Sequence, residues 1–266
     1  MIRILDEGDF HCGDVLGLGN PDHWPARKRR AAELVWSWRR ERLREIGRVD
    51  VHLLGGDLVH GLPDRHNALG VLTTDLDEQV EMAQEAVAEV KAAHRFFAWG
   101  TPRHTADGNM RLEGLVAKAF GERPRDEIAL GPLHGVRLLD RHVCGRSDIP
   151  YGQGTPLWRE WVRDQLRGIM EDYKAADVHV RHHVHYYFEV RNDKGRAVTC
   201  PCWELPRAKG VDGAPYPLGL RTQYYTVGML LIEIDRTGEV YVRPQIMPLR
   251  LTAPREYLCP KIAENA

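Results

Sequence analysis

The chain has 266 residues, a formal net charge of −1 and a hydrophobic fraction of 43%. This length fits one large domain or two small ones, with enough apolar surface for a substantial core. A net charge near zero gives no sign of a nucleic-acid or membrane partner, and no apolar run approaches the roughly 20 residues that cross a bilayer. The N-terminus lacks the basic and apolar regions of a signal peptide.

Five cysteines are scattered along the chain: Cys12, Cys144, Cys200, Cys202 and Cys259. An odd number without regular spacing favours reduced thiols and a cytoplasmic location. Cys200 and Cys202 are separated by one residue, whereas zinc knuckles and redox motifs have a two-residue spacer. We therefore interpret this pair as structural.

Predicted strands and helices alternate along most of the chain. Strands, some with their exit loops, are expected at residues 1–9, 49–57, 95–104, 135–145 and 177–190. Helices are expected at residues 25–47, 76–94, 110–121 and 156–176. Residues 224–235 and 238–249 predict a hairpin. The alternation indicates an α/β fold with a mixed sheet, and the late strands predict a second, antiparallel-rich sheet packed on the first.

The predicted helix at residues 25–47 combines an apolar face with a basic cluster. The apolar face is expected to hold Ala31, Leu34, Val35, Trp38 and Ile46. The basic cluster comprises Arg27, Lys28, Arg29, Arg30, Arg39, Arg40, Arg42 and Arg44, with Trp36 and Trp38 interleaved. Such a face can follow a nucleic-acid backbone, although a solvated helix surface often has the same composition.

Acids and histidines follow the ends of five predicted strands: Asp9 and His11, then Asp57, His104, His142, and finally His183 with His185. In α/β sheets, ligands bind at the carboxyl ends of the strands. Each residue alone also fits a turn cap or an ordinary surface or core histidine. Their joint occurrence favours a metal site, because carboxylates and imidazoles suit Mn²⁺, Fe, Zn²⁺ or Ni²⁺.

The motif order Asp-x-His, Gly-Asp, Gly-Thr-x-x-His, His and His-x-His resembles the calcineurin-like metallophosphoesterase superfamily. Its pattern is D-x-H, G-D, G-N-H-[DE], H and G-H-x-H, and the Gly-Thr-Pro-x-His variant is similar to uncharacterised, often phage-encoded branches. The resemblance implies a four-layer αββα sandwich in which two mixed sheets pack face to face. It also implies one domain over residues 1–250, followed by a C-terminal tail at 251–266, with the late hairpin closing the second sheet.

The resemblance further implies a phosphoesterase that depends on two divalent metal ions. We expect Mn²⁺, with Fe, Zn²⁺ or Ni²⁺ as alternatives. Asp9, His11 and His185 would hold the first ion, and His142 and His183 the second, with Asp57 bridging both. Paired cations clamp the attacking and leaving oxygens of a phosphoryl group and acidify a bridging water into a hydroxide nucleophile.

Two motifs depart from the superfamily pattern. Thr101 stands at the asparagine position and is therefore a candidate ligand of the second ion, and the expected histidine comes three residues later as His104. Either the second ion is held more weakly, or His104 becomes a ligand, or water fills the position; we expect His104 near the metals, as a ligand or as the acid for the leaving oxygen. His182 replaces the glycine of the last motif, which leaves open whether His182 or His183 faces the metal, and spacing favours His183.

Three arginines lie beside the motifs and are candidates to bind substrate phosphate: Arg103, Arg146 and Arg181. The first hypothesis is a phosphodiesterase or nuclease, with nucleic acid as a candidate partner. The second is a phosphomonoesterase acting on a nucleotide or phosphoprotein. The third is a metal-binding scaffold with weak or no turnover. No membrane partner is expected, and the sequence does not predict an oligomeric state.

Overall fold

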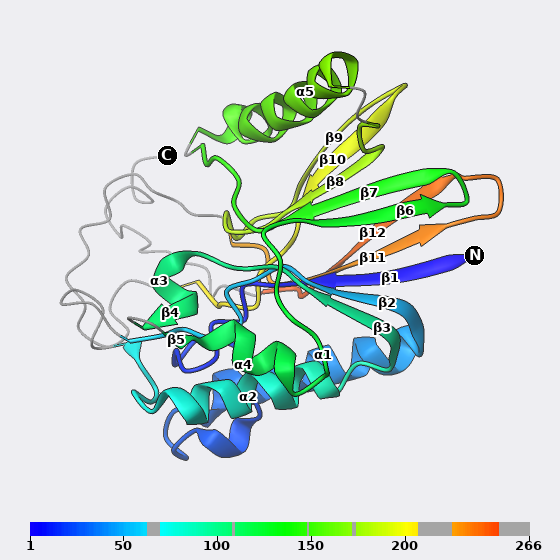
Figure 1. The fold of residues 1–266 in the computed structure, drawn as a ribbon. Helices are drawn as coiled ribbons and strands as arrows, with labels where there is room; N and C mark the ends of the chain where they lie inside the picture. Colours follow the sequence, from blue (N-terminus) through cyan, green and yellow to red (C-terminus); the bar gives the residue numbers. More distant parts are fainter. Residues whose placement is uncertain (63–69, 108–109, 148, 172–173, 207–224, 250–266) are drawn as a thin grey trace, which may run out of the picture.

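The protein folds into two five-stranded mixed sheets that pack face to face, with helices on both outer faces (Figure 1). This computed structural model describes residues 1–62, 70–107, 110–147, 149–171, 174–206 and 225–249. The layered arrangement confirms the predicted α/β sandwich. The expected tail at residues 251–266 lies outside the described residues, so the domain boundary at residue 250 stays a prediction.

The first sheet has the strand order β12-β11-β1-β2-β3. Its strands are β1 (Ile2–Glu7), β2 (Val49–Leu54), β3 (Ala92–Phe97), β11 (Gly228–Ile234) and β12 (Val240–Ile246). The three early strands are parallel, and β11 and β12 run antiparallel along the other side of β1. The carboxyl ends of β1, β2 and β3 therefore meet at one edge of this sheet.

The second sheet has the order β6-β7-β8-β10-β9. Its strands are β6 (Ile128–Leu133), β7 (Val136–Arg141), β8 (Val178–Arg181), β9 (Phe188–Asn192) and β10 (Gly195–Thr199). The central strands β7, β8 and β10 are parallel, with an antiparallel strand at each edge. The predicted strands at 135–145 and 177–190 correspond to β7, β8 and β9.

The late hairpin forms where it was predicted, but it joins the other sheet. Strand β11 pairs antiparallel with β1, from Ile2 opposite Ile234 to Asp6 opposite Leu230. The expectation that the hairpin closes the second sheet is therefore wrong. The reason is that β1 has β2 on only one side, and the apolar β11 completes its backbone hydrogen bonds. Three features of the strand pairing were not predicted. They are β6, whose register shifts between Leu130 and Leu133, β10 between β8 and β9, and the short pair β4 (Ala106–Asp107) and β5 (Met110–Arg111).

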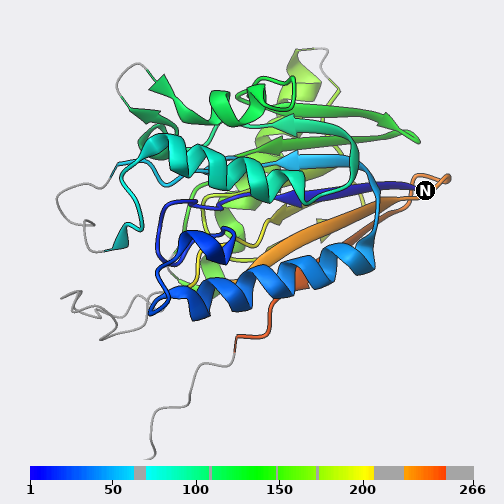
Figure 2. The ribbon, with the colours of Figure 1, turned by 90° about the horizontal axis from the view of Figure 1, so that it is seen from below.

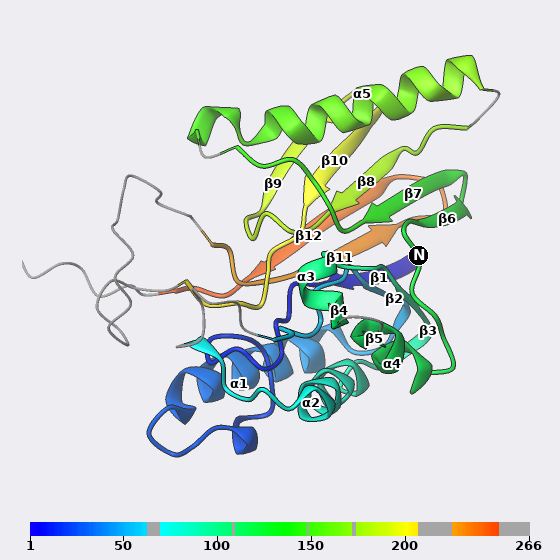
Figure 3. The same ribbon diagram turned by 60° about the vertical axis from the view of Figure 1, so that its left-hand side comes forward.

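Helices cover the outer faces. Helices α1 (Arg29–Ile46), α2 (Leu76–Ala88) and α4 (Leu112–Lys118) lie across the first sheet (Figure 2), and α5 (Gly154–Met170) covers the second sheet (Figure 3). The remaining helical turns are η1 (Pro21–His23), α3 (Pro102–Thr105) and η3 (Pro150–Gly152). Within the described residues, no helix combines the length and apolar character needed to cross a membrane. Four cysteines are buried and free of disulfides: Cys12, Cys144, Cys200 and Cys202.

Alternating side chains of the first sheet's strands contribute to two separate cores, one on each face of the sheet. Ile4 and Leu53 point between the sheets, where they meet Val180 of the second sheet. Their chain neighbours Leu5 and Leu54 point to the opposite face and pack with the helices. This alternation is the period-2 pattern of strands buried on both faces.

The apolar face of α1 differs from the prediction at several positions. Val35 and Ile46 are buried as expected, whereas Leu34 is 57% exposed and Trp36 takes a buried position instead. The larger surprise is Arg39, which was assigned to the basic surface cluster but is 0% exposed. Its guanidinium donates to both carboxylate oxygens of Glu7, at 3.1 and 2.6 Å.

Arg39→Met is expected to lower the free energy of unfolding by about 3–5 kcal/mol, because it leaves the Glu7 carboxylate buried without its cation. Arg40→Met is the matched control: Arg40 is exposed and pairs with Glu89, so its loss costs at most about 1 kcal/mol. Urea denaturation measures both. Equal effects for the two variants would show that the buried pair contributes no more than the surface pair.

Candidate metal centre

The predicted ligands come together from the ends of strands in both sheets. Asp9 and His11 follow β1, Asp57 follows β2, His142 follows β7, and His183 and His185 follow β8. They do not lie at the edge of a single sheet, because β7 and β8 belong to the second sheet. The sheets pack so that their carboxyl ends meet at one place.

The first group of side chains contains Asp9, His11 and His185, whose candidate ligand atoms lie within 4.8 Å of one another. Nε2 of His185 lies 3.3 Å from Asp9 Oδ1 and 3.2 Å from His11 Nε2. Ligand atoms that bind one ion at about 2.1 Å lie roughly 3–3.5 Å apart, so this spacing fits a shared cation. Asp9 Oδ1 is buried and has no hydrogen bond among the described residues.

The second group contains Asp57, His142 and His183. Nε2 of His142 lies 3.0 Å from Asp57 Oδ2, and the His142 Nδ1 atom lies 2.6 Å from the carbonyl oxygen of Gly55. This backbone contact leaves Nε2 as the ligand nitrogen, as expected when a second partner orients a metal-binding imidazole. The two groups adjoin, because the backbone N–H of His183 donates to Asp9 Oδ2 at 3.0 Å.

Unusual backbone conformation marks the same residues. Among the described residues, six that are not glycine have positive φ, and five of them are predicted ligands: Asp9 (50°), His11 (48°), Asp57 (50°), His183 (73°) and His185 (60°). Such conformations cost about 1–3 kcal/mol each and concentrate at functional sites. Both His183 and His185 lie in the loop after β8, which ends at Arg181, and not on a strand face.

Asp57 is held by the loop that follows β3. Its Oδ1 accepts hydrogen bonds from the backbone N–H of Thr101 at 2.6 Å and from the Thr101 hydroxyl at 3.1 Å. The loops touch at Gly100, where a Cβ atom would lie 2.1 Å from Asp57 Oδ1. Glu113 of α4 accepts from the N–H groups of Gly100 (2.7 Å) and Leu58 (3.2 Å), which fixes both loops.

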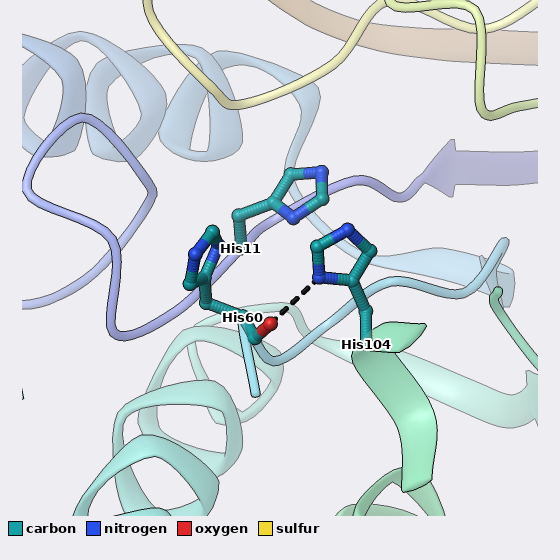
Figure 4. A group of neighbouring side chains, drawn as sticks. All are labelled: His11, His60 and His104. Carbon is teal, nitrogen blue, oxygen red and sulfur yellow. Dashed lines mark hydrogen bonds between the residues drawn. The ribbon is translucent and has the colours of Figure 1, made fainter. Parts of the chain in front are cut away.

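His104 lies in a cluster of three imidazoles with His11 and His60 (Figure 4). Its ring centroid is 4.7 Å from that of His11 and 5.3 Å from that of His60. Its Nδ1 lies 2.6 Å from the carbonyl oxygen of His60, which assigns the proton to Nδ1 and leaves Nε2 as an acceptor. His104 therefore lies beside the first group of ligands and is not part of the second.

The charges of the centre are paired. Burial opposes a charge on His142, but the Asp57 carboxylate outweighs it and raises the pKa of His142 to about 9. Burial likewise opposes a charge on His185, and Asp9 together with Glu204 raises its pKa to about 10. At neutral pH both rings are therefore protonated next to their carboxylates, and a metal ion that binds them displaces these protons.

The three predicted phosphate-binding arginines have different surroundings. Arg181 is buried, and its guanidinium donates to Glu160 at 2.7 Å and to the carbonyl oxygen of Leu139 at 3.2 Å, so its assignment to substrate is corrected. Arg146 is exposed in the loop after β7. The backbone of Arg103 belongs to α3, and its side chain lies outside the described part of the structure.

Several side chains of the centre were missed in the sequence. His60 lies three residues after Asp57, and Glu204 contacts the His185 Nδ1 atom at 3.2 Å. The only signal for His60 was a histidine close behind the Gly-Asp motif. Glu113 and Glu204 gave no signal, because their role depends on tertiary contacts. His182 is turned away from both ligand groups, so His183 is the member of the pair that joins the second group.

Neither known protein families nor curated proteins match the chain. Among solved structures, a single mutant of Vps29 from Entamoeba histolytica has 14% identity and a TM-score of 0.42, with 92% of this chain and 99% of that chain covered. Wild-type Vps29 from the same organism, complexed with Zn²⁺, has 12% identity and a TM-score of 0.40 over 92% and 99% of the two chains.

A conserved uncharacterized protein from Streptococcus pneumoniae TIGR4, described as a predicted phosphoesterase, has 13% identity and a TM-score of 0.38, with 92% of this chain and 98% of that chain covered. Identities and TM-scores this low carry no argument about activity. The two packed mixed sheets and the ligand groups at their strand ends agree with the resemblance of the sequence to the calcineurin-like metallophosphoesterase superfamily.

Proposed function

We propose that the protein is a hydrolase of phosphate esters that depends on two divalent cations, with phosphodiesters as preferred substrates. The observation that carries this proposal is the pair of adjoining ligand groups, Asp9–His11–His185 and Asp57–His142–His183, in strained loops at the meeting edge of two sheets. Oxygen and nitrogen donors of this kind suit Mn²⁺, which we propose as the metal, with Fe, Zn²⁺ and Ni²⁺ as alternatives.

The proposed reaction assigns separate roles to the cations, to Asp57 and Thr101, and to His104. The cations would supply Lewis acidity, orient the phosphoryl group and lower the pKa of water. Asp57, held by the N–H and hydroxyl of Thr101, would contribute to both ion sites. Thr101 then acts by orienting Asp57, which is the role we propose for the residue at the asparagine position of the motif. In its doubly protonated form, His104 would give the Nε2 proton to the leaving oxygen, while the Nδ1 proton stays on the ring and is donated in the hydrogen bond to the His60 carbonyl oxygen.

The preference for diesters rests on the arginines. A dianionic monoester favours a clamp of several guanidinium groups, and Arg181 is occupied with Glu160. Arg103 and Arg146 remain as proposed phosphate contacts. Support for a nucleic-acid partner is weaker than the sequence suggested, since Arg39 is internal and Arg40 and Arg42 pair with glutamates.

The test measures metal content by elemental analysis and hydrolysis of bis-p-nitrophenyl phosphate and p-nitrophenyl phosphate with added Mn²⁺. The proposal expects at least two bound ions per chain and faster diester turnover. Faster monoester turnover would favour the phosphomonoesterase. Bound metal without turnover of either ester, for any added cation, would favour the scaffold and overturn the hydrolase.

His104→Asn is expected to lower kcat by about 10²-fold, which is at the low end for loss of a general acid. The asparagine keeps a donor for the His60 carbonyl, so the loop should keep its shape. Because p-nitrophenolate leaves without protonation, the loss should be much smaller for a p-nitrophenyl ester than for an alkyl phosphodiester. An equal loss for both leaving groups would contradict the acid role and point to metal binding by His104.

A further inference from the structure

Directly beneath the metal centre, four polar side chains meet between the two sheets. Asp6 lies on β1, Asp140 on β7, His182 just after β8, and Cys200 just after β10. All four are 0% exposed. We call these four residues the inter-sheet cluster; none of them belongs to the two ligand groups described above.

The distances within the inter-sheet cluster resemble those within the metal centre. Nε2 of His182 lies 3.2 Å from Asp6 Oδ1 and 3.2 Å from Asp140 Oδ1. Candidate ligand atoms of Asp6, His182 and Cys200 all lie within 4.8 Å of one another. Ligand atoms that bind one tetrahedral ion, with bonds of about 2.0–2.3 Å to nitrogen, oxygen and sulfur, lie roughly 3.3–3.8 Å apart. The His182–carboxylate distances of 3.2 Å are close to this range.

Hydrogen bonds account for only part of this arrangement: the Cys200 thiol donates to the Asp6 carbonyl oxygen at 3.5 Å, and the single His182 ring faces the carboxylates of both Asp6 and Asp140. Both carboxylate oxygens of Asp6, both of Asp140 and both ring nitrogens of His182 are buried without a hydrogen-bond partner in the described structure. A single ring N–H cannot be directed at two carboxylates at once. Two buried carboxylates without full compensation are costly, and buried charges are otherwise paired or bound to metals.

The surrounding backbone makes room for the ring. A Cβ atom on Gly55 would lie 2.0 Å from His182 Nε2, and one on Gly8 would lie 2.7 Å from His182 Nδ1. The His182 ring also lies parallel to that of His142, with centroids 6.3 Å apart and an interplanar angle of 6°. His182, which replaces the glycine of the superfamily motif, is therefore accommodated by glycines on two neighbouring loops and placed next to a ligand of the metal centre.

We propose that the inter-sheet cluster is a third, closed metal site, with Asp6, Asp140, His182 and Cys200 as the four ligands of a Zn²⁺-type ion. Two carboxylates, one imidazole and one sulfur form a donor set that tetrahedral Zn²⁺ accepts, and a site with four protein ligands is structural. The ion ties β1 of the first sheet to β7, β8 and β10 of the second. Because the site has no exposed atom, the ion enters during folding and exchanges slowly afterwards.

Bound Co²⁺ shows a sulfur-to-cobalt charge-transfer absorption only where a thiolate is a ligand, and the dinuclear centre has no thiolate ligand. Cys200 is the only sulfur ligand among the proposed sites, so refolding the full chain with excess Co²⁺ should produce a sulfur-to-cobalt charge-transfer absorption and three ions per chain. Cys200→Ser should abolish the absorption and lower the content to two ions. Cys144→Ser is the matched control, since Cys144 is a buried thiol against α5, and it should keep both.

The outcomes separate this proposal from the proposed function. Asp57→Asn should lose ions from the dinuclear centre but keep the sulfur-to-cobalt absorption, so the absorption reports the inter-sheet cluster even if the hydrolase proposal fails. If Cys200→Ser does not fold, the wild-type protein decides alone. A wild-type chain that is folded by circular dichroism, but has no such absorption in excess Co²⁺, would overturn the site and leave His182 as an imidazole that pairs with the Asp6 and Asp140 carboxylates.

Discussion

Asp57→Asn is expected to lower kcat/KM for phosphodiester hydrolysis by about 10³-fold or more. The carboxylate is the one residue proposed to serve both ions, and the clamp that paired cations provide stabilises the transition state by several kcal/mol. Since each 1.36 kcal/mol is a factor of ten in rate, a loss of about 4 kcal/mol gives this magnitude. The amide of asparagine preserves size but brings no negative charge, and its NH₂ group opposes the N–H and hydroxyl of Thr101.

Steady-state kinetics and metal analysis of the same preparation check this prediction. Asp193→Asn serves as the control, because Asp193 is exposed in the turn between β9 and β10. It should retain wild-type turnover and metal content. If Asp57→Asn kept both ions and full turnover, the proposed bridging role would be wrong, whatever the other ligands do.

The overall affinity for the pair of Mn²⁺ ions is expected to rise about 10²-fold per pH unit between pH 6 and 8, which is about tenfold for each ion. His142 and His185 have pKa values raised to about 9 and about 10 by neighbouring carboxylates, so both are protonated throughout this range. Metal binding must displace both protons, and each contributes a factor of about ten per pH unit. Activity at limiting Mn²⁺ should therefore fall as the solution becomes more acidic.

Competition with a metal-sensitive dye at several pH values measures the slope. His142→Asn removes one of the two displaced protons and should reduce the slope to about tenfold per unit, with weaker binding overall. An affinity that stays constant from pH 6 to 8 would contradict ligation by these imidazoles.

The same pKa shifts predict the pH dependence of the metal-free fold. Because the folded-state values are above the usual histidine value near 6.5, the two His–Asp pairs stabilise the fold fully below that pH. Their contribution is lost as the pH rises through about 9 and then about 10.

The local pattern of the chain was sufficient for most of the elements. Alternation of apolar strands with amphipathic helices predicted an α/β fold with a mixed sheet, because side-chain periods of 2 and 3.6 are local properties. The second sheet was expected from the late strands, which join the first sheet instead. Gly-Gly-Asp and similar strand exits predicted which residues reach the carboxyl ends. The sheet to which β11 belongs was not predictable from local sequence. The apolar pattern of β11 fits either sheet, and its pairing with β1 places it in the first sheet.

The chemistry of individual charged residues was decided by tertiary structure. Arg39 and Arg181 look like surface arginines in the sequence, yet each is buried against a glutamate from a distant segment, at 2.6 and 2.7 Å. Periodicity cannot reveal this, because a buried ion pair depends on the partner that the fold supplies. Leu34 shows the converse, an apolar side chain at a helix position that no layer covers.

The sequence by itself determined that acids and histidines would gather at strand ends, since motif order and strand polarity fix their position along the chain. Only the tertiary structure decided that these ends come from both sheets and that His104 lies beside His60. It also decided that His182 lies beneath the centre between Asp6 and Asp140. The physical reason is that a ligand group depends on distances of about 3 Å between segments far apart in the chain, and packing of the two sheets sets those distances.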